Sequence, residues 1–568
     1  MANVNRATAP APLAPLPFNI PTPKEHEFPN GLRLVHFEDN RFPLVSFRLA
    51  FFSGDAVDSA DNIGLTSAAA SMLTEGTAAY SSRELAEKIE RLGASVSAHA
   101  SDDFTVLSAS SLSLYTADIL DLMEEIILRP TFPESELDLF RRNSLEHLRF
   151  QRSQPGFLAN EQTARLLYGE HPYARVSPSP ADVEKLKRED LITFHGRTFV
   201  PNNAILIVVG AVGQNELVEA VHDRFGKWAP QALHAPEFPE LSLREKRTLT
   251  IVDRPGSAQT NIVLANLAIN RKHPDYFPVL VMNQVLGAGA SSRVFMNLRE
   301  EKGYTYGAYT RFDAKRFAGD FEATAEVRTA VTGDSLKEFF YELERIRDEK
   351  ASDQELTDAK NFLTGVFPIR AETQEGLTNL LVNQYLYDLP GDYLQTYRDQ
   401  VSAVTSEQVQ EAAKKYIHPD KLAIVLVGDA DEILNQVGHY ADDVEIFDTE
   451  KNPKDISSYS GERREPVDAS GSWELSVDFQ GQIVPVTLVL TEQDGTISGS
   501  LETVFGKGEI SEGTISGNKF SAKAATEVQG QKLDLSISGK ISGDSIAGTL
   551  TAPIAPDPLS FSGNRKTQ

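Results

Sequence analysis

The chain has 568 residues, more than one hydrophobic core usually organises, and its apolar and charged fractions are ordinary for a globular protein. Its 81 acidic and 55 basic residues give a formal charge of -26, which argues against binding nucleic acid or an anionic membrane, because both require a cationic face. The chain has no cysteine, so disulfides, thiolate nucleophiles and cysteine-ligated metals are excluded.

Residues 1–27 are predicted to be an Ala/Pro-rich leader, because the segment as far as residue 23 offers little to bury. The leader lacks the hydrophobic stretch of a signal peptide. The longest apolar run, residues 204–212, is far shorter than the ~20 residues that cross a bilayer, so we expect no transmembrane segment. From the leader and the missing cysteines we expect a periplasmic or secreted protein, with a cytoplasmic one as the alternative.

An internal repeat organises the body of the chain. The segment PNNAILIVVG at 201–210 matches PDKLAIVLVG at 419–428, at an offset of 218 residues. Upstream, PESEL at 133–137 matches SDQEL at 352–356, at an offset of 219, and each begins an amphipathic helix. Two matches at nearly one offset indicate a duplication, with lobes at 28–235 and 236–445.

The C-terminal part of the chain differs in composition. Residues 446–470 are polar and lack apolar periodicity, which predicts a linker. Residues 471–568 contain short alternating runs such as ELSVDF and PVTLVL, with turn signals such as Asp494-Gly495 and Gly543-Asp544. This pattern predicts a small all-β barrel or sandwich. It contains no catalytic grouping, so we interpret it as a binding or stabilising module, with a plain spacer as the alternative.

A helix is predicted at residues 64–77, GLTSAAASMLTEGT, where apolar side chains form one stripe and Gly76 can end the helix. Its frame resembles the GL-x-H-x-x-E-H-M-L-x-x-GT signature of the pitrilysin, insulinase and mitochondrial-processing-peptidase family of zinc metallopeptidases. The resemblance extends from residue 28 to about 445. It implies an α+β fold of two duplicated αβ-roll lobes, each a mixed sheet packed with helices, followed here by the β module.

The resemblance places the family's two zinc histidines at Ser67 and Ser71, and its catalytic glutamate at Ala70. Histidines at i and i+4 project from one face of a helix and can hold one metal, whereas serine is a poor zinc ligand and alanine cannot act as a base. The third ligand would fall at Leu148, with Glu146 and His147 nearby. We therefore expect no zinc on this chain.

Residues 286–312, LGAGASSRVFMNLREEKGYTYGAYTRF, resemble the family's second-lobe signature G-x-x-SSRL…LRE-x-x-G-x-x-Y. The residues alone predict a helix capped by Ser291 or Ser292, stopped by Gly303 and followed by an aromatic-rich strand. Val294, Met296 and Leu298 are expected to be its buried side chains.

The family's substrate-holding arginine and tyrosine map onto Arg299 and Tyr306. A guanidinium and a phenol suit this task because both can donate hydrogen bonds to an oxyanion. Taken without the signature, the two residues are an ordinary exposed arginine at a helix end and a tyrosine in a sheet. The loop containing Gly287 and Gly289 is predicted to turn tightly into the helix, and the resemblance implies that it approaches the substrate.

The resemblance implies a non-catalytic subunit of a two-chain peptidase, offering Arg299 and Tyr306 to the zinc site of a homologous partner that binds peptides or unfolded polypeptides. The zinc is then expected on the partner. The alternative is a non-enzymatic peptide-binding or scaffold protein, as a homodimer. A third hypothesis is an independent hydrolase that uses residues the sequence does not reveal.

Overall fold

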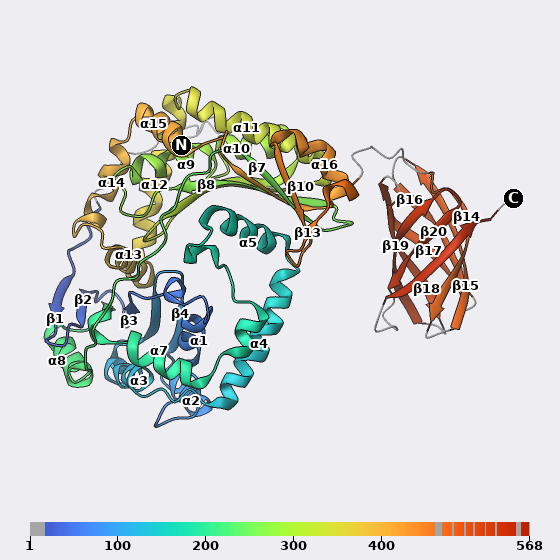
Figure 1. Ribbon diagram of the computed structural model, residues 1–568. Helices are drawn as coiled ribbons and strands as arrows, with labels where there is room; N and C mark the ends of the chain where they lie inside the picture. Colours follow the sequence, from blue (N-terminus) through green and yellow to red (C-terminus); the bar gives the residue numbers. More distant parts are fainter. Residues whose placement is uncertain are drawn as a thin grey trace, which may run out of the picture. The chain divides into compact units, whose positions relative to one another are not determined.

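The computed structural model describes residues 18–459 and most of 468–566, with gaps at 480–481, 494–495, 504–505, 517–518, 529–530 and 552–557 (Figure 1). Residues 1–17 of the predicted leader and the Asp494-Gly495 turn lie outside the described residues. The first compact unit ends at Ser458 and the second begins at Tyr459. Among the helices that the structure describes, none is both long and apolar enough to cross a membrane.

The first lobe is built on a six-stranded mixed sheet with the order β1-β2-β6-β3-β5-β4. Its strands are β1 (Lys24–Glu27), β2 (Arg33–Glu38), β3 (Leu44–Phe51), β4 (Ser95–Ala100), β5 (Thr105–Leu112) and β6 (Ala204–Gly210). Its helices are α1 (Leu65–Met72), α2 (Ser82–Arg91), α3 (Thr116–Leu128), α4 (Glu134–Arg152), α5 (Pro155–Tyr168), α6 (Pro180–Lys185), α7 (Arg188–Thr198) and α8 (Gln214–Phe225). Strands β2 and β6 are parallel, and the other neighbours are antiparallel.

The second lobe has a seven-stranded sheet with the order β13-β12-β7-β11-β8-β10-β9. Its strands are β7 (Thr248–Asp253), β8 (Gln259–Ala268), β9 (Thr305–Ala314), β10 (Gly319–Arg328), β11 (Ala423–Gly428), β12 (Asp443–Phe447) and β13 (Pro453–Lys454). Its helices are α9 (Tyr276–Leu286), α10 (Arg293–Phe295), α11 (Thr332–Asp348), α12 (Asp353–Glu372), α13 (Gln374–Leu386), α14 (Tyr393–Ala403), α15 (Ser406–Tyr416) and α16 (Ala430–Val437).

The two sheets share one topology, so the predicted duplication is confirmed. The order β2-β6-β3-β5-β4 in the first lobe corresponds to β7-β11-β8-β10-β9 in the second. In each lobe the first and last of these strands in the chain, β2 with β6 and β7 with β11, pair in parallel. Strands β12 and β13 extend the second sheet into residues 446–454, which the sequence had assigned to the linker.

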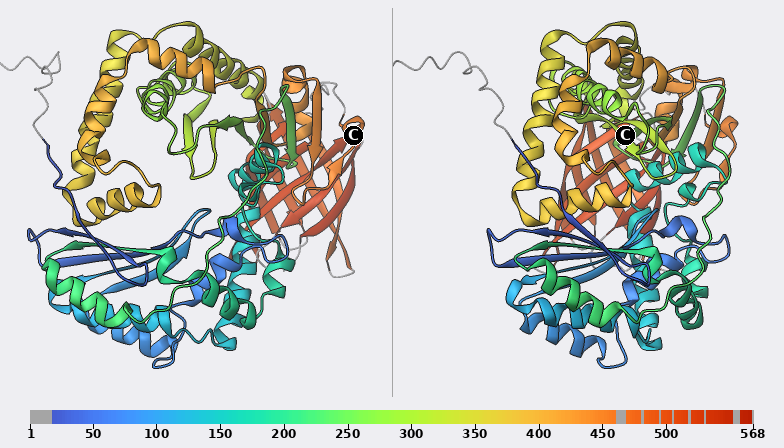
Figure 2. Two further views of the ribbon diagram at one scale, coloured as in Figure 1. Left: turned by 60° about the vertical axis from the view of Figure 1, so that its left-hand side comes forward. Right: turned by 90° about the vertical axis from the view of Figure 1, so that its left-hand side faces the viewer.

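The repeated motifs PNNAILIVVG and PDKLAIVLVG contain the strands β6 and β11, and every residue of both strands is buried. A strand that is covered on both faces is expected to be apolar throughout rather than alternating. In each lobe the lobe's own helices cover one face of the sheet. In Figure 2 first-lobe helices such as α3 and α8 lie below the blue sheet, whose other face is turned toward the second lobe.

The other face of each sheet is covered by a helix from the opposite lobe. Helix α13 packs on β3 and β6 of the first sheet, and α5 packs on β8 and β11 of the second, so that α5 lies between the sheets in Figure 1. One shared core joins Ile205 and Ile207 to Leu381. Another joins Leu158 to Val263. The two lobes therefore complete each other's cores.

Two equivalent hairpin turns also meet between the lobes. Lys315, in the β9–β10 turn, forms an ion pair with Asp102 of the β4–β5 turn at 2.7 Å. The backbone amide of Arg316 donates to the Asp103 carboxylate at 2.9 Å, and the Tyr173 hydroxyl donates to the same carboxylate. These polar contacts fix the lobes where the apolar cores end.

One prediction about the leader is wrong at its end. The segment before residue 23 was expected to bury little, but part of it packs on the second lobe. Ile20 is buried, its carbonyl accepts from Gln395 at 3.0 Å, and the Phe18 ring packs edge-on against Phe367. Strand β1 then pairs with β2. The apolar side chains among the prolines are enough to attach this segment to the second lobe.

The second unit is a closed eight-stranded antiparallel barrel, which resolves the predicted choice between barrel and sandwich. Its strands are β14 (Gly471–Phe479), β15 (Gln482–Gln493), β16 (Thr496–Thr503), β17 (Gly506–Ser516), β18 (Lys519–Val528), β19 (Gln531–Ser542), β20 (Ser545–Thr551) and β21 (Leu559–Arg565). Alternate residues fill the interior around Trp473, whose indole donates to the Ala469 carbonyl at 3.1 Å. Closure removes the free strand edges that promote aggregation.

Because the core is shared, we predict that a substitution that weakens the packing of α13 also destabilises the first lobe. Leu381→Ala removes a fully buried side chain and is expected to cost about 2–5 kcal/mol. Hydrogen exchange should show lost protection in β6 as well as in α13. Asn379→Ala, at an exposed position of the same helix, is the control and should leave both protected. Loss of protection confined to α13 would contradict the shared core.

Candidate functional site

Helix α1 begins at the predicted motif, and the Asp58 carboxylate holds its first turn. Gly64 precedes the helix with φ 87°, a left-handed conformation that favours glycine. The amides of Gly64 and Thr66 donate to Asp58 at 2.8 and 3.1 Å, and the Thr66 hydroxyl donates at 2.5 Å. A carboxylate at this end also complements the helix dipole.

The residues at the three positions of the family's zinc-binding motif, Ser67, Ala70 and Ser71, lie in different environments. Ser67 donates from its hydroxyl to both Asp55 oxygens, at 2.9 and 2.8 Å, and from its amide at 3.0 Å. Ala70 is completely buried in the core, and Ser71 is exposed. The serine at the first position is therefore part of a local hydrogen-bond network with an aspartate, which the sequence had not indicated.

The two aspartates hold protons more tightly than usual. Burial raises the pKa of Asp55 to about 6, against the hydrogen bonds from Ser67. Burial, reinforced by the neighbouring Asp55 charge, raises the pKa of Asp58 to about 7. Both carboxyl groups are already engaged by donors from α1.

The helix that would carry the third ligand does not provide one. Helix α4 packs against α1 and directs Leu148 into the core, while Glu146 and His147 are exposed and Glu146 pairs with Arg149. Within the described ranges, no group of three or more His, Asp or Glu side chains is arranged to hold a metal. Neither serine nor alanine at the motif positions fits a zinc site.

The glycine loop of the second lobe follows α9. Gly287 is required by packing, since a Cβ there would lie 2.4 Å from Thr310 Oγ1, and its carbonyl accepts from the Thr310 amide at 3.0 Å. Gly289 has more room, with Gln284 Nε2 as the nearest neighbour of an added Cβ at 3.0 Å. The structure thus explains Gly287 through its contact with β9, and the substrate role of both glycines stays a prediction.

The helix after this loop is short and irregular. α10 spans Arg293–Phe295 and continues as a π-helix, η5 (Met296–Glu301), before Gly303 turns with φ 65°. Ser292 occupies the N-cap position, but its hydroxyl donates to the Gly289 carbonyl at 2.6 Å instead of capping the helix. Met296, expected in the core, is 41% exposed, because the wider π turn shifts side chains out of the α-helical register.

Arg299 lies in the π-helix and Tyr306 in the edge strand β9. The Arg299 guanidinium pairs with Glu300 at 2.5 Å and lies 5.1 Å above the Phe295 ring, which in turn contacts Tyr309. Tyr306 is 91% exposed. η5 and β9 are packed together, although the two side chains form no hydrogen bond with each other among the described residues. Short π-helical segments occur often at functional sites.

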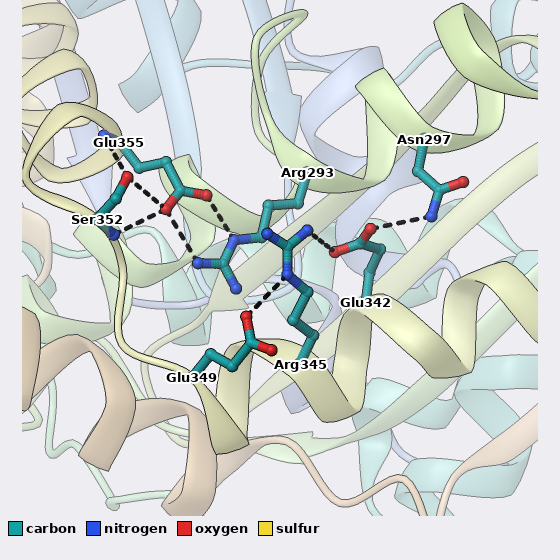
Figure 3. A network of polar contacts seen from close by, with 7 residues as sticks. All are labelled: Arg293, Asn297, Glu342, Arg345, Glu349, Ser352 and Glu355. Atoms are coloured by element: carbon teal, nitrogen blue, oxygen red, sulfur yellow. Dashed lines mark hydrogen bonds and ion pairs between the residues drawn. The ribbon is translucent and has the colours of Figure 1, made fainter.

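Beneath this surface, a buried ion pair fixes the segment that carries Arg299 (Figure 3). Arg293, only 6% exposed, donates from Nε and Nη2 to Glu355 at 2.6 and 3.0 Å. Glu355 also accepts from the amide and the hydroxyl of Ser352, both at 2.8 Å, in the capping box of α12. Burial acts to raise the pKa of Glu355, but the Arg293 guanidinium and the Ser352 donors outweigh it and lower the pKa to about 2.

A second contact holds η5 to α11. Asn297 donates to Glu342 at 2.9 Å and to Glu338 at 3.1 Å. Glu342 in turn pairs with Arg345 at 3.4 Å. The α10–η5 segment is thus anchored to α12 through Arg293 and to α11 through Asn297, and it is open to solvent on the side of Arg299.

Comparison with known families agrees with this geometry. The model described as "Insulinase (Peptidase family M16)" matches residues 34–175, and "Peptidase M16 inactive domain" matches residues 185–363. The chain belongs to peptidase family M16. The inactive-domain match covers the second lobe only, and in the first lobe the zinc motif positions hold Ser67, Ala70 and Ser71, so together they support a peptidase-like, non-catalytic member.

Similar proteins include one named "Non-peptidase homolog YmxG" from Helicobacter pylori, 22% identical over 69% of this chain and 91% of its own length. "Uncharacterized zinc protease YmxG" from Bacillus subtilis is 21% identical over 70% of this chain and 96% of its own. Among solved structures, a peptidase M16 inactive domain from Pseudomonas fluorescens is 28% identical, with a TM-score of 0.68 and coverage of 72% of this chain and 98% of that one.

Several residues that shape these sites were missed by the sequence predictions. Asp55 and Asp58 lie in the loop before the motif helix, where nothing in the pattern distinguishes a capping carboxylate from a solvated one. Arg293 follows the cap serines, and only the fold shows that it is buried. Glu355 could have been found, since Ser352 and Glu355 have the spacing of a capping box.

The aspartates predict that stability depends on pH. A carboxyl group whose pKa is higher in the folded chain stabilises that state when protonated. Its contribution is complete below the unfolded pKa and lost as pH rises through the folded value. For Asp58 the stabilisation is lost between about pH 4 and about pH 7. The pKa shift corresponds to at most about 4 kcal/mol of unfolding free energy.

The measurement is the unfolding free energy of wild type and Asp58→Asn at pH 5 and pH 8. The advantage of wild type over the variant should shrink as pH rises. Asp61→Asn, at an exposed site in the same loop, should keep the wild-type dependence. A gap between wild type and Asp58→Asn that grows with pH would contradict the assignment.

The Arg293–Glu355 pair predicts a second effect. Glu355→Gln leaves Arg293 buried without its counter-charge, and because Glu355 is partly exposed we expect a loss of about 2–3 kcal/mol, below the range of a fully buried pair. Hydrogen exchange should accelerate in η5. The matched control is Glu349→Gln in the same network, since the exposed Glu349–Arg345 pair should contribute less than about 1 kcal/mol. Equal effects of the two substitutions would contradict the anchoring role.

Proposed function

We propose that this chain is the non-catalytic subunit of a heteromeric zinc metallopeptidase that acts on peptides. In this proposal Arg299 and Tyr306 reach the zinc site of a homologous partner, bind the substrate backbone and stabilise the oxyanion. The observation that carries it is the exposed pair itself, held on an anchored π-helix and an edge strand in a chain whose own motif lacks zinc ligands. Zinc and the attacking water would belong to the partner.

Physical reasons support these two roles. Tyr306 is 91% exposed, so packing does not account for a large aromatic side chain at this position. Arg299 can exchange its exposed partner Glu300 for a substrate at little cost, because exposed ion pairs contribute little. A donor aimed at a developing oxyanion typically contributes 10²–10³-fold to kcat.

The test is coexpression of the full chain with a homologue from the same genome that bears the H-x-x-E-H motif. The pair should copurify and cleave peptides, and Arg299→Ala or Tyr306→Phe should lower kcat about 10²–10³-fold without changing complex formation or the partner's zinc content. Tyr309→Phe, on the same strand, is the matched control and should keep near-normal activity.

Full activity with both Arg299→Ala and Tyr306→Phe would rule out the in-trans role. Stoichiometric zinc on the isolated chain would contradict a zinc-free subunit. Peptide binding by a homodimer, with no zinc-bearing homologue that copurifies, would favour the scaffold alternative.

A further inference from the structure

Arg271 is a buried cation without a counter-charge. It lies in the loop between β8 and α9 and is 7% exposed. Within the described part of the chain it forms no ion pair, whereas its neighbour Lys272 pairs with Asp388 at 2.6 Å. Arginine stays protonated in proteins, and a buried charge is costly unless it is paired. An unpaired guanidinium here is notable in a chain with a net charge of -26.

Three aromatic rings and two neutral acceptors surround this guanidinium. Its Cζ lies 3.8 Å from the ring centroid of Tyr276, 5.1 Å from that of Tyr393 and 6.0 Å from that of Tyr387. Nη2 donates to Asn383 Oδ1 at 3.1 Å and to Tyr393 Oη at 2.7 Å. Cation–π contacts offset part of the desolvation cost of the guanidinium. Nε and Nη1 have no acceptor among the residues described.

The guanidinium lines a cavity of about 580 Å³ in the second lobe. One part of its wall is apolar and aromatic, with Phe277, Pro274 and Pro390 beside Tyr276, and the rest is polar and includes His273, Thr396 and Gln400. Volumes in this range accommodate small organic molecules, and such sites are usually apolar with a few polar groups. The cavity therefore combines an unpaired donor with room for an apolar body.

The charges around the cavity restrict the kind of anion. Asp388 and Asp392 also line it. Of the other basic residues in the lining, Lys272 is paired with Asp388, and Nδ1 of His273 accepts from the Asp275 amide at 3.1 Å. A phosphate dianion would meet a single unpaired cation and two carboxylates, whereas a monoanion needs only Arg271. Asp388 has φ 48°, a conformation that non-glycine residues rarely adopt outside constrained sites.

We propose that this cavity binds an organic monocarboxylate with an apolar or aromatic body, with its carboxylate on Arg271. The ligand is either the C-terminus of a peptide or a free organic acid. The site is separate from Arg299 and Tyr306 and does not depend on the proposed role with a zinc-bearing partner.

The experiment titrates the full chain by calorimetry with N-acetylphenylalanine and with its amide, N-acetylphenylalaninamide. The acid should bind at least about 10-fold more tightly, because only the acid carries the charge. Equal affinity for the two would overturn the proposal. 3-Phenylpropanoate separates the sources: weaker binding than the acetylated amino acid supports a peptide terminus, and equal or tighter binding supports a free acid.

Variants locate the site. Arg271→Met should abolish binding of N-acetylphenylalanine, and Lys414→Met, which removes an exposed cation of the same lobe outside the cavity, should leave it within about twofold. If Arg271→Met does not fold, Thr396→Trp fills the cavity with Arg271 intact and should also abolish binding. Unchanged binding in a folded Arg271→Met or Thr396→Trp variant would overturn the site, and so would inorganic phosphate binding more tightly than N-acetylphenylalanine.

Discussion

Each sheet of the first unit has one face that its own lobe does not cover. Helix α13 covers this face on the first sheet and α5 covers it on the second, so neither lobe has a complete core alone. Burial of one leucine or isoleucine contributes about 1.5–3 kcal/mol, and each shared core contains many such side chains. This exchange of α5 and α13 between the lobes makes them one cooperative unit. It also aligns the β4–β5 and β9–β10 turns that meet between them.

The packing of α1 explains how this helix can lack the zinc-binding residues and still keep its position in the fold. Helix α1 is held by the core through Ala68, Ala69 and Met72, and by Asp58 at its first turn. None of these contacts uses the positions of the family's zinc ligands. Ser67 is bound by Asp55 and Ala70 simply fills space, so the helix is stable without metal.

The duplication could be predicted from the sequence because the two matching segments form β6 and β11. These strands are buried on both faces and are therefore apolar throughout. The sequence could not predict the exchange, since the patterns of α5 and α13 show only which face is apolar and not which sheet that face meets. The same limit applies to Arg293: a guanidinium next to a cap serine is usually solvated, and only its contact with Glu355, 62 positions later, makes it structural. Met296 was assigned to the core because periodicity assumes an α-helix, and the π turn breaks that assumption.

In the second lobe, residues 293–299 are firmly anchored on one side and exposed to solvent on the other. Arg293 and Asn297 face inward and are fixed by carboxylates of α11 and α12, whereas Arg299 faces solvent a few residues later. On a helix with about 3.6 residues per turn, position 299 lies about 200° around the axis from position 297, so an inward-facing Asn297 leaves Arg299 on the solvent side. The segment thus combines rigid support and an exposed guanidinium within seven residues.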